Sequence, residues 1–205
     1  MRLILSVMLL LFMLSGCKQK SETSTQNQPT AENLPEVKKE GAEITGQAFT
    51  TLSSNLQQAL SEGGVSSALE FCNIQAMPLA DSLSKNYGVE IRRASHQPRN
   101  PDNRADSLEA VSIKKYINAL EANGELKPYT YRTRNSFIYH APIRITGQLC
   151  LNGHGSPGID ISEKDMEVIR ELYPEDEATG FSQGDLRGIW AIEFPKNYFE
   201  TDKKQ

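Results

Sequence analysis

The sequence predicts an α+β fold in which helices come first and a mostly antiparallel sheet with helical inserts follows. Two segments near the start of the folded region, 42–60 and 65–86, carry apolar residues at helical spacing. Four later segments have the composition or alternation of β-strands: 89–95, 129–133, 137–145 and 188–194.

The first predicted helix, 42–60, has an apolar stripe made of Ile44, Ala48, Leu52, Leu56 and Leu60. Gly63-Gly64 ends it, and a second helix over 65–86 follows. The stripe of this second helix is Val65, Leu69, Cys72, Ala76, Leu79 and Leu83. Cys72 is therefore expected to point into the core, and Pro78 is expected to bend the helix about one turn after Cys72.

A third helix is predicted over 106–123, with Asp106 and Glu109 spaced as a capping box. Its expected apolar side consists of Leu108, Val111, Tyr116, Ile117 and Leu120. A short helix over 163–172 is capped by Ser162, with Asp165 three residues later. The polar segment 96–104 is predicted as a loop, and 134–136 as the turn of a hairpin.

The N-terminus has the pattern of a bacterial lipoprotein signal. A basic start precedes an apolar run from Leu3 to Leu14, which is too short to span a membrane. Leu14-Ser15-Gly16-Cys17 resembles a lipobox, which implies cleavage of residues 1–16 and lipidation of Cys17. An ordinary signal peptide is the alternative. We therefore expect a membrane anchor through Cys17 in the cell envelope, and an outer-membrane location facing the periplasm.

Residues 17–41 are mostly polar and are predicted to be a flexible linker, because they offer too little apolar surface to fold. The domain is predicted over 42–198, and 199–205 as a polar tail. The chain has a formal net charge of −4 and no basic patch, so nucleic acid is not an expected partner.

The stretch around Cys150 and His154 carries the most chemical information. The spacing of these residues is that of the c-type haem attachment box Cys-x-x-Cys-His, with Gly153 in place of the second cysteine. Such a box would keep one covalent link to haem and one axial ligand. The alternatives are a site that has lost its haem, and a glycine-rich turn whose cysteine and histidine are incidental.

Cys72 is the other cysteine of the folded domain, and its thiolate would be a suitable axial ligand for haem iron. It could also be a free buried cysteine. A Cys72–Cys150 disulfide is a third possibility in an oxidising compartment, and would need no cofactor.

The remaining polar candidates have simpler explanations. His140 is expected to be a hydrogen-bonded strand histidine on the face opposite Tyr139, and His96 to be solvated in its loop. A zinc site from Cys72, Cys150, His154 and His140 lacks a Cys-x-x-Cys pair. A Cys72/His154 nucleophile pair lacks an oxyanion loop. The loop 99–103 is explained by a chain of Asx turns. The alternative is that one of Arg92, Arg93 and Arg99 pairs with an anionic ligand group such as a haem propionate.

Taken together, these segments resemble the PAS-like periplasmic mono-haem c-type family, a domain of unknown function. The resemblance covers about 44–194. The matching segments are 68–72, Met77-Pro78, 89–93, 99–103, Glu109, 141–155, 173–176, Ala178, 180–181, 184–185 and 187–188. It implies a PAS-like sheet with helices against it, and a haem with His154 as one axial ligand and Cys72 as a candidate for the other. Gly153 is the departure from the family pattern.

The leading functional hypothesis is a lipid-anchored haem-binding domain for redox sensing or electron relay. Cys150 would hold the ring, His154 and Cys72 would bind iron, and Arg99 would contact the cofactor. With both axial positions filled, no open position is left for a substrate, so enzyme activity is not expected. A redox or signalling protein would be the partner. The alternative is a haem-free binding or structural domain stabilised by the Cys72–Cys150 disulfide.

Overall fold

The computed structural model describes residues 33–200. The predicted signal peptide, Cys17 and most of the predicted linker lie outside these residues. The elements are α1 (Leu34–Tyr87), β1 (Glu90–Ala94), η2 (Pro101–Asn103), α2 (Ser107–Glu121), β2 (Tyr129–Arg132), β3 (Ser136–Arg144), α3 (Gln148–His154), α4 (Glu163–Leu172), β4 (Leu186–Pro195) and η3 (Tyr198–Glu200). The α+β class and the order of helices before sheet are confirmed.

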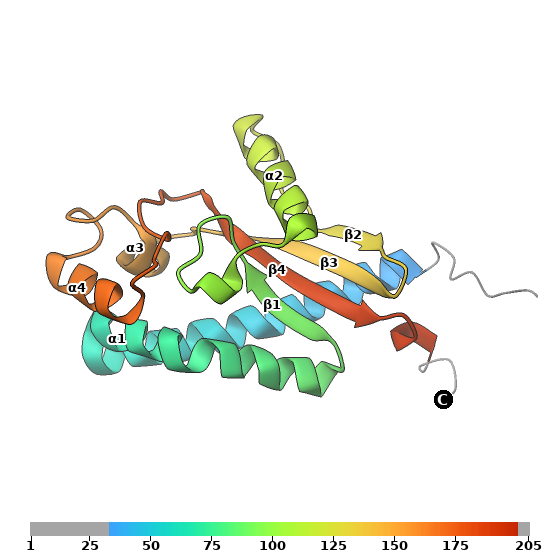
Figure 1. Ribbon diagram of the computed structural model, residues 1–205, viewed down its shortest axis with the longest axis horizontal. Helices are drawn as coiled ribbons and strands as arrows, with labels where there is room; N and C mark the ends of the chain where they lie inside the picture. The colour runs from blue at the N-terminus through green and yellow to red at the C-terminus, as the bar shows by residue number, and fades with distance from the viewer. Residues whose placement is uncertain (1–32, 201–205) are drawn as a thin grey trace, which may run out of the picture. The chain divides into compact units, whose positions relative to one another are not determined.

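The sheet has four antiparallel strands in the order β1-β4-β3-β2 (Figure 1). The last strand of the chain, β4, therefore lies in the middle, between the first strand and the β2–β3 hairpin. Arg93 on β1 is opposite Trp190 on β4, and Tyr139 on β3 is opposite Ile192. All four predicted strands are present, each within two residues of its predicted ends.

Helix α1 begins at Leu34, eight residues before the start predicted from the apolar stripe, so residues 34–41 of the predicted linker are helical. Pro35 lies in the first turn, where its missing N–H costs nothing. Val37 is fully buried and packs with Ile44 against the sheet. The polar composition of 34–41 obscured these two extra turns, which tertiary packing stabilises.

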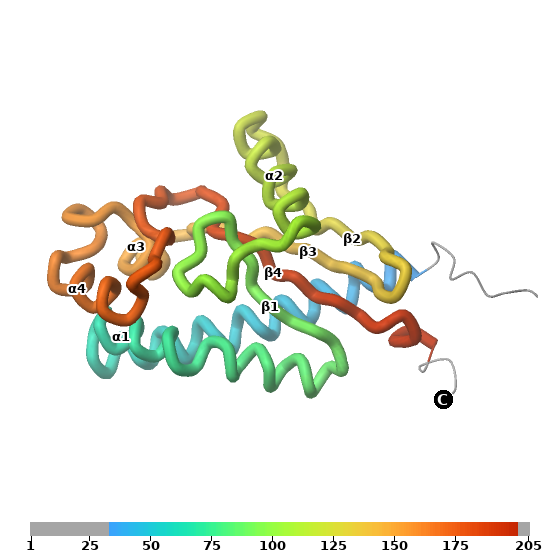
Figure 2. Tube along the Cα trace, in the orientation of Figure 1, coloured from blue at the N-terminus to red at the C-terminus, as the bar shows by residue number. Residues whose placement is uncertain are grey.

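At Gly63 and Gly64 the backbone leaves helical geometry, and α1 folds back as two antiparallel arms (Figure 2). Gly64 has φ of +72°, a conformation that glycine adopts without a steric penalty. The first arm, 34–62, and the second arm, 65–87, correspond to the two predicted helices. Pro78 lies within the second arm.

The two arms of α1 cover one face of the sheet, and their apolar residues form the main core with Ile91, Tyr139, Trp190 and Phe194. Helix α2 packs on the opposite face through Ile113 and Tyr116 (Figure 1). The capping box of Asp106 and Glu109 is confirmed.

The predicted inner face of α2 is wrong in part. Leu108 and Val111 are exposed, while Glu109 and Ser112 are buried beside Ile113 and Tyr116. The buried polar groups have partners: Glu109 binds the helix cap and Ser112 binds His140. Hydrogen bonding allows polar residues on an inner face, which apolar periodicity cannot detect.

The segment around Cys150 is also different from its prediction. It forms the short helix α3, whereas the sequence offered a glycine-rich turn as one of its alternatives. The carbonyl of Gly147 accepts hydrogen bonds from the backbone of Cys150 and Leu151, and Gly155 ends the helix. Cys150 and His154 are therefore one helical turn apart, on the same side of α3.

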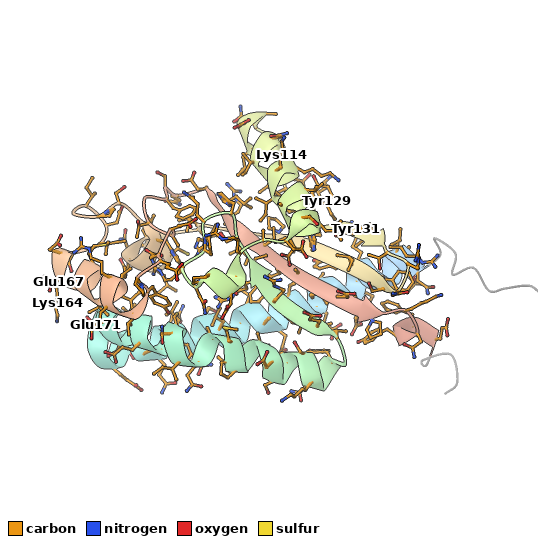
Figure 3. The ribbon with its side chains drawn as sticks, viewed as in Figure 1. Lys114, Tyr129, Tyr131, Lys164, Glu167 and Glu171 are labelled. Carbon is orange, nitrogen blue, oxygen red and sulfur yellow. The ribbon has the colours of Figure 1, made fainter. Side chains whose placement is uncertain are left out.

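Helix α4 lies beside the second arm of α1, and Asn73 Nδ2 donates a hydrogen bond to the Leu172 carbonyl, at 3.3 Å. The predicted Ser162 cap of α4 is present, and the Ser162 hydroxyl accepts a hydrogen bond from the Asp165 N–H. Lys164, Glu167 and Glu171 are exposed on the outer side of α4 (Figure 3).

Phe199, which was predicted to belong to the polar tail, packs with the core. In η3, Phe199 makes ring contacts with Phe137, Phe194 and Tyr198. Among residues 33–200, no helix combines the length and apolar character that a bilayer crossing requires.

Candidate functional site

A cavity of about 370 Å³ lies between both arms of α1, the end of the sheet and α3. It brings together the three residues that the sequence singled out: Cys72, Cys150 and His154 all line it. Cys72 comes from the second arm of α1, while the other two come from α3. Cys72 and Cys150, which are 78 positions apart in the chain, therefore line the same cavity.

The walls of the cavity combine an apolar surface with positive charge. The apolar part includes Leu52, Leu56, Leu60, Val65, Leu69 and Trp190. The charged lining residues are Arg93, Arg99, Arg144 and Arg187, and within residues 33–200 no aspartate or glutamate lines the cavity. Such a site suits a large apolar ligand that carries anionic groups.

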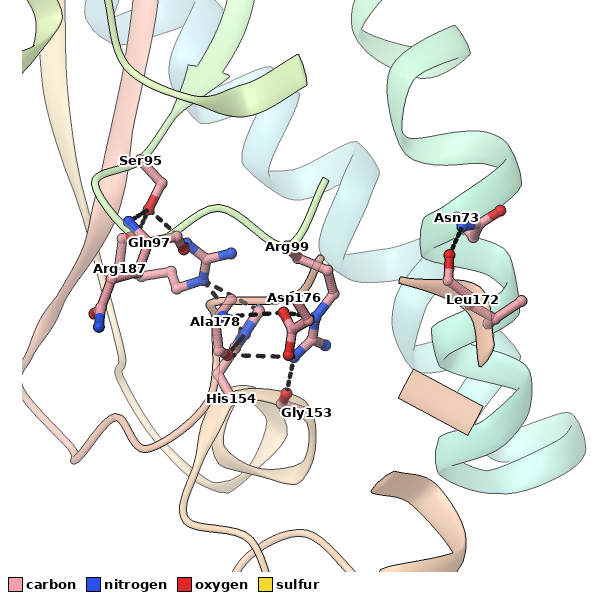
Figure 4. Close-up of polar contacts among 10 residues, drawn as sticks. All are labelled: Asn73, Ser95, Gln97, Arg99, Gly153, His154, Leu172, Asp176, Ala178 and Arg187. Atoms are coloured by element: carbon pink, nitrogen blue, oxygen red, sulfur yellow. Dashed lines mark hydrogen bonds and ion pairs between the residues drawn. The ribbon is translucent and has the colours of Figure 1, made fainter. Parts of the chain in front are cut away.

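His154 is held in one tautomer by the backbone. Its Nδ1–H donates a hydrogen bond to the Ala178 carbonyl oxygen, at 2.8 Å (Figure 4). The lone pair is therefore on Nε2. Burial, followed by the charge of Arg187, holds the pKa of His154 well below 6.5. The imidazole is thus neutral at pH 7, which is the form that binds metal ions.

Arg187 lies against the ring of His154, with Nε at 3.3 Å from Nδ1 and 3.4 Å from Nε2. Its Nη1 group donates to Ser95 Oγ at 2.8 Å and to the Gln97 carbonyl at 3.0 Å. Burial lowers the pKa of Arg187 to about 9, so the guanidinium stays charged at pH 7. Apart from the family resemblance, nothing in the sequence singles out Arg187, because a lone arginine before a strand has no distinctive pattern.

Cys72 and Cys150 are both free thiols, so the disulfide of the alternative hypothesis is not formed in the structure. Burial raises the pKa of Cys72, and the guanidiniums of Arg93 and Arg99 oppose part of that effect. Cys150 packs beside Ile145, Ala178 and Phe181. Cys72 was expected to point into the core. It is only partly buried, because the cavity lies in front of it.

The three candidate arginines have different surroundings. Arg92 faces α2, where its Nε lies 3.6 Å from Glu109. Arg99 lines the cavity, but its Nε binds Asp176 at 3.0 Å and its Nη2 binds the Gly153 carbonyl at 2.6 Å. Arg93 also lines the cavity and has no ion pair within the described residues.

The arrangement therefore favours Arg93 over Arg99 as the residue that meets an anionic ligand group. The predicted cofactor contact of Arg99 stays a prediction.

The other histidines lie away from the cavity lining. His140 is buried on the α2 face of the sheet, and its Nδ1 is 2.8 Å from Ser112 Oγ. His96 is exposed, and its ring contacts Phe181 edge to face. Residues 33–200 contain no cluster of three or more His, Cys, Asp or Glu able to hold a metal ion, so the zinc arrangement is not formed.

Comparison with known proteins adds a family and a fold. The chain is similar to the crystal structure of the cyanobacterial heme-protein Tll0287, with 24% sequence identity and a TM-score of 0.57. The match covers 77% of this chain and 96% of that one, and it concerns the fold. No curated protein matches. The model of the Tll0287-like family matches residues 18–195, and the chain belongs to this family.

Proposed function

We propose that this chain is a lipid-anchored domain of the cell envelope that binds one haem covalently and senses or relays redox state. Cys150 would hold the haem through a single thioether, and His154 and Cys72 would bind its iron. The observation that carries the proposal is that one cavity collects these three side chains from separate elements. The heme-protein Tll0287, which has the same fold, supports the choice of cofactor.

The residues present fit a haem. A thiol and an imidazole whose Nε2 carries the lone pair are donors that haem iron accepts. The apolar walls exclude water from a porphyrin, and Arg93 offers a cation to its propionates. When bound, haem supplies an iron centre that exchanges single electrons.

Gly153 limits the attachment to one thioether. It lines the same cavity as Cys150, but it has no side chain to react with a second vinyl group. The helix α3 nevertheless presents Cys150 and His154 with the spacing of a complete attachment box. A single link through Cys150 therefore agrees with the backbone geometry.

The proposed role is electron relay or sensing, and we propose no enzyme activity. If Cys72 and His154 occupy both axial positions, a substrate has no open coordination position. The redox or signalling partner would then act by contact with the domain surface. The membrane anchor is proposed from the lipobox resemblance at Cys17, which lies outside the described residues.

The test is an absorption spectrum with a pyridine haemochrome assay. The domain is expressed without its lipid anchor in a periplasm that has c-type maturation machinery. We expect a Soret band that survives acid extraction, and a haemochrome α-band between the b-type and ordinary c-type positions. Cys150→Ser should make the haem extractable. A colourless wild-type protein would contradict the proposal.

A further inference from the structure

One backbone oxygen in the site is shared between two donors. The carbonyl of Ala178 accepts the hydrogen bond from His154 Nδ1 at 2.8 Å and a second one from Arg99 Nη2 at 3.2 Å (Figure 4). Two donors that share an acceptor weaken each other, and a charged donor competes strongly.

Arg99 is fixed in this position by a carboxylate. Asp176 Oδ1 accepts from Arg99 Nε at 3.0 Å, and it also accepts the backbone N–H of Ala178 at 3.0 Å. The Arg99 and Asp176 side chains are 9% and 8% exposed, so water screens this pair poorly. Asp176, Arg99, Ala178 and His154 therefore form one continuous hydrogen-bonded chain.

We propose that Arg99 and Asp176 are positioning residues that set the electron-donor strength of His154. This inference rests on the proposed function, in which Nε2 of His154 binds iron. A ligand histidine donates more strongly when the acceptor of its N–H is more basic. Arg99 draws charge from the Ala178 oxygen and weakens His154 as a donor. Asp176 partly neutralises Arg99 and restores some of that strength.

The prediction is a pair of shifts with opposite sign. Asp176→Asn keeps an oxygen for the Ala178 N–H but removes the charge that moderates Arg99, so the haem reduction potential should rise. Arg99→Gln removes the cation, so the potential should fall. A purely structural role would loosen the site in both variants and would not give opposite shifts.

Glu177→Gln is the matched control. It removes the same unit charge one residue away, from an exposed pair with Arg104 that does not bind the Ala178 carbonyl. Its shift in potential should be much smaller than that of Asp176→Asn. If Arg99→Gln does not fold, the Arg99→Gln/Asp176→Asn double variant replaces it, and its potential should lie below that of the wild type.

A second readout needs no haem. In the haem-free protein, the NMR resonance of the His154 Nδ1–H reports its hydrogen bond to Ala178. We expect it to move upfield in Asp176→Asn, downfield in Arg99→Gln, and to stay in place in Glu177→Gln. A field effect that bypasses the carbonyl would shift the potentials without these changes and would overturn the inference. A colourless protein with the expected NMR shifts would instead contradict only the proposed function.

Discussion

Arg99 donates a hydrogen bond from Nη2 to the carbonyl oxygen of Gly153, and the two atoms are 2.6 Å apart. This bond fixes the backbone at the position where a complete attachment box has its second cysteine. A Cβ added at Gly153 would lie 3.5 Å from Arg99 Nη1 and 3.8 Å from Leu69 Cδ2, which is ordinary contact. The site therefore lacks the second cysteine of a complete box but has space for that residue's first side-chain atom.

We accordingly expect Gly153→Cys to restore attachment through two thioethers. The pyridine haemochrome α-band should move to the ordinary c-type position, and mass spectrometry should show haem on both cysteines. Asn152→Cys is the control, because it adds a thiol one position away on α3. An unchanged α-band in Gly153→Cys would show that residue 153 does not face a vinyl group.

Cys72→Ser tests the second axial ligand. Replacing a thiolate by a hydroxyl removes a strong electron donor, so the Soret band should move and the reduction potential should rise by on the order of 0.1 V or more, within the span of roughly 0.8 V that axial ligands control. Haem should stay covalently bound, because Cys150 is unchanged. Identical spectra of variant and wild type would exclude Cys72 as a ligand.

Much of the fold could be predicted because its signals are local. The apolar stripes located both arms of α1, and the Asp106 and Ser162 caps located the starts of α2 and α4. Strand composition located all four strands. The order of strands, with β4 between β1 and β3, could not be predicted, since it depends on pairings between segments far apart in the chain.

In the functional site, too, local features could be predicted from the sequence and contacts between distant segments could not. The spacing of Cys150 and His154 is a local signal, and the helical stripe placed Cys72 on an inner face. Two facts needed the structure: that Arg99 is bound internally, and that Arg187 lies against His154. Both arise from contacts across loops, where no periodicity exists to be detected.

The turn between the arms of α1 offers a test of backbone conformation. Gly64→Ala places a Cβ on a residue with φ of +72° and ψ of −161°, a region that essentially only glycine occupies, and should destabilise the domain by about 1–3 kcal/mol. Gly46→Ala is the matched change at an exposed helical position with open space around it, and should stabilise by up to about 1 kcal/mol. Urea unfolding measures both. Equal changes in the free energy of unfolding at the two sites would contradict the positive φ at residue 64.

His140 should make the stability of the domain depend on pH. Burial lowers its pKa from 6.5 to about 4. Because the folded state resists protonation, its contribution is complete above pH 6.5 and is lost as the pH falls toward 4. The shift corresponds to about 3 kcal/mol of unfolding free energy over this window. Other groups contribute to the pH dependence of stability, so the wild type must be compared with a variant at each pH.

His140→Asn provides that comparison, because its amide can keep the hydrogen bond to Ser112 without titrating. The variant should be less stable than the wild type at pH 7, since it leaves part of the ring's space unfilled. The difference should shrink by about 3 kcal/mol as the pH falls from 7 to 4 in urea unfolding. If the two stability curves stay parallel across this range, the fold does not hold the imidazole of His140 in its neutral form.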